Sequence, residues 1–326
     1  MKSNVESADQ SAKEPGRPPV PSELGAIPAR KKFTRKNRAR RSSKVWNSRP
    51  TAAQLQLNQT DVTRRIPVGL STSSVFPLGL ERCFQAAHET GYDGVEVMVS
   101  VGKDTRDAHT LRSHVLTYEQ PILSLHAPTL FFLQFLGGLD PAKKLEDTMR
   151  LAVDLGVPTV VAHPPFRWQG SYARRFVDTV AELEEKYQVE LAVENMYPWR
   201  LGVREALPYF PDHDPTDEAY RHVTVDLSHA STAGDDALVM IDRVGDRLAH
   251  LHLTDGSGNT LKDEHLVPGD GNQPAAEILQ RLVRRGWHGS IVVEIATGKS
   301  RSLSAKLPDI RRSLAFARRE LGHHLL

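Results

Sequence analysis

Side chains of the types that bind metal ions stand at the ends of short apolar runs in this sequence. Residues 121–126 and 190–194 are two such runs, and they end on a histidine and a glutamate. Six runs end this way, and the terminal residues are His126, His163, Glu194, Asp226, His252 and Glu294. Ionisable side chains are rarely buried without partners, so a purely stabilising role explains them poorly. Their types and positions predict a shared metal site.

Three more residues of these types follow two of the runs. His229 comes three residues after Asp226, and Asp263 and His265 lie in the loop after the run that contains His252. Nine ligands are enough for two or three ions that share carboxylates, whereas a single catalytic ion needs three or four. Histidine and carboxylate ligands favour Zn²⁺ or Mn²⁺, with Mg²⁺ and Co²⁺ as further options. Taken alone, Asp226 and His229 also fit the capped start of a helix.

The elements that must position these residues alternate along the chain. Strands are predicted at residues 67–70, 94–98, 121–126, 159–163, 190–194, 223–226, 248–252 and 290–294. Helices are predicted at residues 80–90, 105–118, 142–155, 172–187, 215–221, 236–244, 274–285 and 303–320. This alternation predicts parallel βαβ units and a closed (β/α)8 TIM barrel over residues 66–322, with a doubly wound open sheet as the alternative. A parallel barrel gathers its strand carboxyl ends on one face, where barrel active sites lie. His250 shares strand parity with His252 and is expected one layer deeper, as a hydrogen-bonded core residue.

Residues 1–62 differ in composition from the rest and are predicted to be a disordered basic extension. Residues 1–65 hold 15 Lys and Arg against 5 Asp and Glu, which leaves 27 basic and 35 acidic side chains for the remainder. An acidic barrel therefore carries a basic tail. The tail is expected either to be a solvated segment without a role or to make weak, non-specific contacts with nucleic acid.

Other bulk features limit the protein class. No apolar run approaches the roughly 18 residues that a membrane span needs, and no apolar segment follows the basic N-terminal residues as a secretory signal requires. The single cysteine, Cys83, is predicted to be a packing residue in a helix. These features favour a reducing cytoplasm and leave the oligomeric state open.

Several motifs resemble the xylose isomerase-like TIM-barrel superfamily. They are Leu125-His-Ala-Pro128, Val193-Glu-Asn195, Val225-Asp-Leu-Ser-His229, His252-Leu-Thr-Asp255, Asp263-Glu-His265 and Val293-Glu294. The superfamily joins sugar and sugar-phosphate isomerases and epimerases to the endonuclease IV type of apurinic endonuclease. The resemblance covers about residues 66–320 and implies the barrel fold and a divalent metal.

The two branches of the superfamily predict different chemistry. In endonuclease IV nine ligands hold three zinc ions, and all nine have a counterpart among the residues named above. However, Tyr92-Asp-Gly-Val-Glu96 resembles a turn of the isomerase branch, and residues 129–132 differ from the endonuclease segment at that place. A duplex-binding protein should present a basic face to phosphates, and this barrel is acidic. The balance favours a small substrate.

The isomerase resemblance implies a metal-dependent isomerase or epimerase of a sugar, polyol or sugar phosphate. It implies four core ligands, namely Glu194, Asp226, His252 and Glu294, with the two glutamates as acid/base candidates at the reacting carbon. His126, His163 and His229 would then orient the substrate or hold a second ion, and Lys262 is a candidate for binding an anionic group. The alternatives are a multi-zinc phosphodiesterase acting on abasic DNA and a non-catalytic metal-binding barrel.

Overall fold

A closed barrel of eight parallel strands forms the core of the protein. The computed structural model describes residues 65–100, 102–128, 140–201 and 204–323, so the predicted tail lies outside the described residues. The strands follow the order β1, β10, β9, β8, β5, β4, β3, β2 around the barrel. Their bounds are β1 Val68–Ser71, β2 Gly94–Met98, β3 Ile122–His126, β4 Thr159–Ala162, β5 Glu190–Glu194, β8 His222–Asp226, β9 Leu248–Leu253 and β10 Ser290–Val293. The TIM barrel predicted from the sequence is confirmed.

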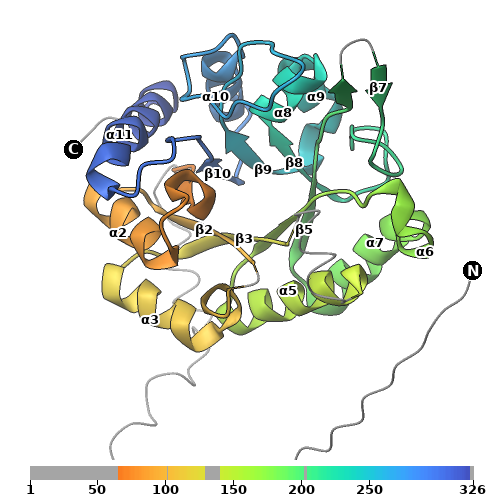
Figure 1. Cartoon of the computed structure of the whole chain (residues 1–326), viewed down its shortest axis with the longest axis horizontal. Helices are drawn as coiled ribbons and strands as arrows, with labels where there is room; N and C mark the ends of the chain where they lie inside the picture. The colour runs from red at the N-terminus through yellow and green to blue at the C-terminus, as the bar shows by residue number, and fades with distance from the viewer. Residues whose placement is uncertain (1–64, 101, 129–139, 202–203, 324–326) are drawn as a thin grey trace, which may run out of the picture. The chain divides into compact units, whose positions relative to one another are not determined.

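Helices surround the barrel, as the view in Figure 1 makes clear. They are α2 Leu80–Thr90, α3 Ala108–Tyr118, α5 Pro141–Leu155, α6 Ser171–Arg174, α7 Phe176–Tyr187, α8 Leu227–Ala233, α9 Ala237–Val244, α10 Ala275–Arg284 and α11 Leu303–Glu320. Local sequence sets their ends. For α5, the Asp140 side chain accepts from the Ala142 N–H at the start, and Gly156 adopts a left-handed conformation at the end.

Close strand packing places the residues that point into the barrel. A Cβ atom at Gly94 would lie 2.5 Å from the Pro121 carbonyl oxygen, so only glycine lets β2 approach β3 this closely. The approach brings Glu96 into register with Ser124 on the neighbouring strand. In β9 every residue is buried, including His250 and His252. The barrel interior therefore contains ionisable groups as well as aliphatic ones.

Two features depart from the predicted pattern. The connection from β5 to β8 contains an antiparallel pair, β6 Trp199–Leu201 and β7 Arg204–Ala206, which the sequence did not predict. The predicted helix at residues 215–221 is wrong, because the carbonyl groups of Thr216, Glu218 and Tyr220 accept from Arg247 instead of forming a helical ladder. Within the described part of this connection there is no α-helix, and α8 begins only after β8.

Two expectations concern the chain as a whole. Within the described ranges, no helix combines the length and apolar character needed to cross a membrane. Cys83 is fully buried on α2, where its thiol contacts the Leu70 carbonyl oxygen and burial raises its pKa. The interpretation of Cys83 as a packing residue is confirmed.

Candidate metal centre

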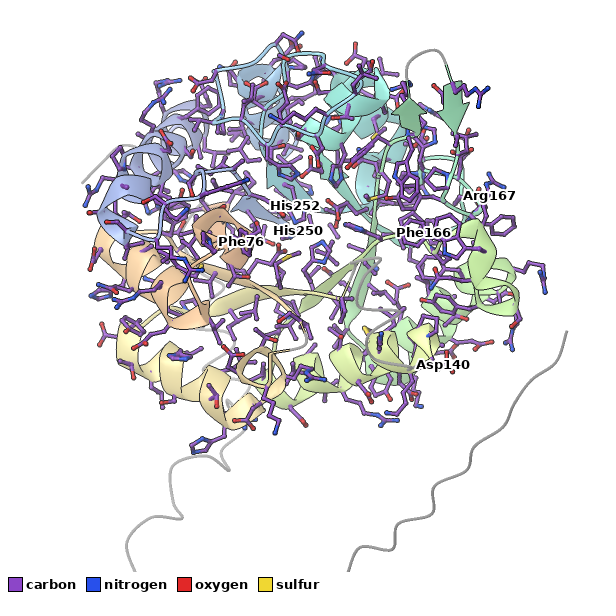
Figure 2. The ribbon with its side chains drawn as sticks, viewed as in Figure 1. Phe76, Asp140, Phe166, Arg167, His250 and His252 are labelled. Carbon is purple, nitrogen blue, oxygen red and sulfur yellow. The ribbon has the colours of Figure 1, made fainter. Side chains whose placement is uncertain are left out.

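The side chains predicted from the strand ends meet at the carboxyl face of the barrel. β3, β5 and β8 end on His126, Glu194 and Asp226. His163 directly follows β4, and His252 lies one residue before the end of β9. Figure 2 places His252 close to the barrel centre. Because all eight strands run the same way, these residues surround one opening.

Three carboxylates surround one nitrogen of His252. His252 Nδ1 lies 2.8 Å from Glu194 Oε1, 3.5 Å from Asp226 Oδ2 and 3.4 Å from Glu294 Oε2. Candidate ligand atoms of Glu194, Asp226 and His252 all lie within 4.8 Å of one another. The four side chains come from β5, β8, β9 and the residue after β10, so four separate strands position the group.

Two oxygens of this group lack a hydrogen-bond partner although they are buried. They are Asp226 Oδ2 and Glu294 Oε2. A buried carboxylate oxygen without a partner is costly, and three acids around one imidazole repel one another. A divalent cation would satisfy these oxygens and offset the repulsion. The group therefore has the composition and the unmet coordination of a metal centre.

Hydrogen bonds fix the orientation of Asp226. Its Oδ1 accepts from the His229 N–H at 2.8 Å and from the Thr254 hydroxyl at 3.2 Å. The Asn195 side chain accepts from the Asp226 N–H at 2.7 Å and donates to the Asp226 carbonyl. Asp226 thus does cap α8, as the alternative interpretation of the sequence suggested. The other oxygen, Oδ2, is left facing His252.

Two histidines contact the second oxygen of Glu194. His126 Nε2 and His163 Nε2 lie 3.1 Å and 2.8 Å from Glu194 Oε2. The three residues form a second group whose ligand atoms lie within 4.8 Å of one another. Glu194 therefore bridges this group and the group around His252, as a carboxylate shared between two ions or between an ion and a bound substrate would.

A third group adjoins Glu194, because His229 Nδ1 lies 3.4 Å from Glu194 Oε1. His229 Nε2 and His265 Nε2 lie 3.3 Å and 2.9 Å from Asp263 Oδ2. The Ser228 hydroxyl donates to Asp263 Oδ1 at 2.6 Å. His265 Nδ1 lies 2.8 Å from the Glu294 carbonyl oxygen, which ties the loop after β9 to the end of β10. The structure thus brings all nine predicted residues into adjoining groups.

Exposure divides the nine residues into an inner and an outer set. The side chains of Glu194, Asp226 and His252 are at most 1% exposed, whereas that of Glu294 is 12% exposed. His163, Asp263 and His265 also reach solvent. A molecule entering from the carboxyl face would meet the outer set first, and Glu294 is the part of the His252 group that it could touch directly.

The electrostatic environment separates the two glutamates. Burial alone would raise the pKa of Glu194, but the charge of His252 and other histidines outweighs burial and holds this pKa well below the usual range. Burial raises the pKa of Glu294. Burial opposes protonation of His265, but Asp263 outweighs it and raises the His265 pKa to about 10. Two carboxylates in one site with pKa values moved apart suit acid and base roles.

The residue beneath the centre was not among those predicted from the sequence. Glu96 Oε1 lies 3.2 Å from His252 Nε2, and Glu96 Oε2 lies 3.1 Å from His250 Nε2. The Ser124 hydroxyl donates to Glu96 Oε2 at 2.7 Å. His250 also contacts the Ser290 hydroxyl at 2.8 Å, so its interpretation as a hydrogen-bonded core residue is confirmed. The isomerase-like turn that ends at Glu96 was the one signal in the sequence for this position.

Lys262 lies in the loop that follows β9. It is an exposed residue next to Asp263, and its charge acts on the pKa of Glu264. Its role in binding an anionic substrate group remains a prediction.

The fold and the strand-end residues define a xylose isomerase-like TIM barrel. The family model of that description matches residues 84–320, and the chain belongs to this family. A protein of Mycobacterium tuberculosis described as uncharacterized is 45% identical over 275 residues, covering 78% of this chain and 98% of that protein. Fructoselysine 3-epimerase of Shigella flexneri is 26% identical over 258 residues, covering 70% of this chain and 90% of the enzyme.

Solved structures repeat the fold at low sequence identity. A D-tagatose 3-epimerase-like protein superposes with a TM-score of 0.55 at 22% identity, covering 78% of this chain and 100% of the other. The IOLI protein, solved with a zinc atom, has a TM-score of 0.58 at 15% identity, covering 80% of this chain and 99% of the other. These likenesses support the barrel architecture.

Proposed function

We propose that this protein is a divalent-metal-dependent isomerase or epimerase of a sugar, a polyol or a sugar phosphate. The observation that carries the proposal is the convergence of Glu194, Asp226 and Glu294 on His252, with two buried carboxylate oxygens unpartnered. The names of related proteins agree with it, since they include a fructoselysine 3-epimerase and a D-tagatose 3-epimerase-like protein.

In this proposal Glu194, Asp226, His252 and Glu294 hold the metal. Their oxygen and nitrogen donors suit Zn²⁺ or Mn²⁺, and Mg²⁺ or Co²⁺ would fit the carboxylates. When bound, the ion supplies Lewis-acid polarisation of a carbonyl, which makes the neighbouring C–H more acidic. Asn195 and Thr254 hold Asp226 so that one oxygen stays directed at this site.

Glu194 and Glu294 move the proton at the substrate carbon. They approach the same imidazole nitrogen from two strands, at 2.8 Å and 3.4 Å, so they flank a common volume. Glu194 is charged and therefore suited to take a proton. The raised pKa of Glu294 suits it to give one. Proton removal by one glutamate and return to the opposite face of the same carbon by the other would invert that carbon. Return to the neighbouring carbon, with a proton shifted between the two oxygens, would move the carbonyl.

The outer residues would orient the substrate. His163 reaches both solvent and Glu194, so a hydroxyl entering the site meets it early. His126 and His229 contact the two oxygens of Glu194 and could position hydroxyl groups or hold a second ion. Lys262 is proposed to bind an anionic end of the substrate where there is one.

A phosphodiesterase of the endonuclease IV type is the second candidate. The observation in its favour is a further possible ligand set, in which atoms of Asp226, His229 and His265 lie within 4.8 Å of one another. Together with ions in the groups around His252 and Glu194, an ion in this set would form a multi-metal cluster of the kind that promotes attack on the phosphorus of a phosphodiester. The net acidic charge of residues 66–326 opposes it, because phosphate backbones are bound by basic surfaces.

Deuterium uptake from heavy water tests the proposal. The metal-loaded protein is incubated with ketoses, polyol ketones and sugar phosphates, and the exchanged C–H is located by NMR. Glu294→Gln keeps the side-chain size but removes a carboxyl group that can exchange a proton with the substrate, so exchange should fall by about 10²- to 10⁴-fold. Glu182→Gln, a 64% exposed carboxylate on α7, is the matched control and should exchange normally.

A parallel assay measures cleavage of abasic-site DNA. Exchange into one of the small molecules, lost in Glu294→Gln and kept in Glu182→Gln, supports the proposal. Cleavage of abasic DNA that disappears in both Glu294→Gln and His265→Ala, without exchange into any sugar, would replace it with the phosphodiesterase.

A further inference from the structure

The loop after β9 carries two residues of the candidate metal centre, Asp263 and His265. It covers residues 256–273, here named the β9 loop, and it begins directly after Asp255. Both residues lie in its interior, several residues from either end. Their positions therefore depend on what holds the loop against the barrel.

The carboxylate of Asp255 binds both ends of the β9 loop. Its Oδ1 accepts from the Gly256 N–H at 2.8 Å and from the Gln273 N–H at 3.0 Å. Its Oδ2 accepts from the Gly269 N–H at 2.8 Å and from the Gly271 N–H at 3.0 Å. One side chain thus joins the first residue of the loop to three residues near its end.

The surroundings of Asp255 are closely packed. The residue is fully buried, and the four hydrogen-bond donors above are neutral backbone groups. A Cβ atom at Gly271 would lie 2.3 Å from Asp255 Oδ1, so only glycine lets the loop come this close. Burying a carboxylate is costly, and buried charges are weak evidence for added stability. A buried carboxylate that binds a single loop is better explained by the conformation that it imposes on that loop.

The backbone of Asp255 holds the middle of the β9 loop as well. Asp255 and Leu266 form an antiparallel bridge, with the two N–H groups 3.0 Å and 2.8 Å from the opposite carbonyl oxygens. Leu266 directly follows His265 in the chain. The bridge therefore fixes the peptide next to that histidine.

The backbone of His265 has a conformation that needs support from its surroundings. Its φ angle is 45°, in the left-handed region that residues other than glycine rarely adopt. Its N–H donates to the Ser228 hydroxyl at 2.9 Å, and its carbonyl accepts from the Ala296 N–H at 2.8 Å. Its ring contacts the Glu294 carbonyl at 2.8 Å. Together with the Asp255 bridge, these contacts fix His265 against the segment that carries Glu294.

We propose that Asp255 is a positioning residue for the metal centre. It holds the β9 loop so that Asp263 and His265 border the opening. Through His265 it also steadies the segment that carries Glu294. This inference rests on the proposed function, because Glu294 moves a substrate proton only in that reaction. Asp255 acts through the loop, whereas the buried members of the centre are held by their own strands.

Two substitutions disturb these hydrogen bonds from opposite sides. Asp255→Asn replaces one accepting oxygen with an amide that donates, so the N–H groups facing it lose their acceptor. Gly271→Ala places a methyl group against the carboxylate. Asp93→Asn is the matched aspartate control, because Asp93 accepts from the Val68 N–H at 2.9 Å at the amino end of the barrel. Gly79→Ala is the glycine control, since a Cβ atom there meets nothing within 4 Å.

Amide hydrogen exchange measures the positioning without reference to turnover. Peptides from residues 256–273 should exchange at least about tenfold faster in Asp255→Asn and Gly271→Ala than in the native protein, while peptides from the barrel strands keep their native rates. Both controls should leave the loop protected. Native exchange rates in the loop of both variants, or equal acceleration throughout the barrel, would overturn the proposal.

Turnover and metal content then separate positioning from metal binding. In metal-loaded Asp255→Asn, deuterium uptake at saturating substrate should fall by about 10- to 100-fold, as a small misplacement of reacting groups can cause. The variant should still hold the native number of ions, and loss of the ion would overturn the proposal. Native uptake in Asp255→Asn would overturn the role of Asp255 alone and leave the isomerase standing. If the native protein itself takes up no deuterium into any substrate, the proposed function fails and this role fails with it.

Discussion

Replacement of Glu96 by glutamine tests whether the buried carboxylate beneath His252 tunes the proposed metal centre. Glutamine keeps the shape and an accepting oxygen for His252 Nε2 but removes the negative charge. The 3.2 Å contact is direct, and both side chains are fully buried, so water cannot substitute for the lost charge. Losing a carboxylate partner of a ligating histidine lowers metal affinity by about 10- to 100-fold. This range corresponds to about 1.4–2.7 kcal/mol, and the absence of solvent favours its upper half.

The assay is calorimetric titration of Zn²⁺ and Mn²⁺ into the metal-free protein at constant pH. Glu190→Gln is the matched control, because Glu190 also accepts a hydroxyl hydrogen bond from a neighbouring strand, at 3.0 Å from Thr159, but at the opposite end of β5. Glu96→Gln should bind metal more weakly and Glu190→Gln should not. An unchanged dissociation constant in Glu96→Gln would refute the reasoning, as would equal weakening in both variants.

Three further outcomes concern the rest of the chain. The hydrogen bond to Glu184 raises the pKa of His222. The protonated histidine therefore stabilises the fold below the unfolded pKa of about 6.5, and this stabilisation is lost as pH rises through the folded pKa. His222→Gln should flatten the pH dependence of the melting temperature above about pH 6, and an unaltered profile speaks against this. Lys306 is buried and donates to two carbonyls and a hydroxyl. Lys306→Met should lower the unfolding free energy measured by urea titration by about 1–3 kcal/mol, whereas an unchanged midpoint would show that these contacts are dispensable. Deletion of residues 1–62 should leave melting and turnover nearly unchanged and remove any weak, salt-sensitive nucleic-acid binding seen in a mobility-shift assay. A truncated protein that does not fold would place the domain boundary elsewhere.

The strand ends were predictable because each is a local pattern. About five residues of sequence are enough to recognise an apolar run that ends on a histidine or carboxylate. The parallel topology of the barrel then brings such strand ends together on one face. His126, Glu194 and Asp226 end their strands as predicted. The helix caps were similarly local, and the helix predicted at residues 80–90 matches α2 at both ends.

The missed features depend on contacts between residues distant in sequence. Glu96 lies 156 residues from His252, and within its own strand it is simply an acid in an apolar run. The strands β6 and β7 have three residues each, too short for an alternating pattern to be recognised. The helix expected at residues 215–221 is displaced by Arg247, whose side chain binds carbonyls that a helix would use itself. Periodicity alone could reveal none of these.

Metal content measured by elemental analysis tests the central claim most directly. The protein is stripped with chelator, reloaded with Zn²⁺ or Mn²⁺ and desalted, and its thermal stability is followed in parallel, since an ion bound only to the folded state raises the melting temperature. We expect about one tightly held ion per chain, as a catalytic site with three or four protein ligands requires. The ion should be lost in Asp226→Asn and retained in His265→Ala. A protein that binds no ion, or one that holds about three ions and loses one in His265→Ala, would contradict the account.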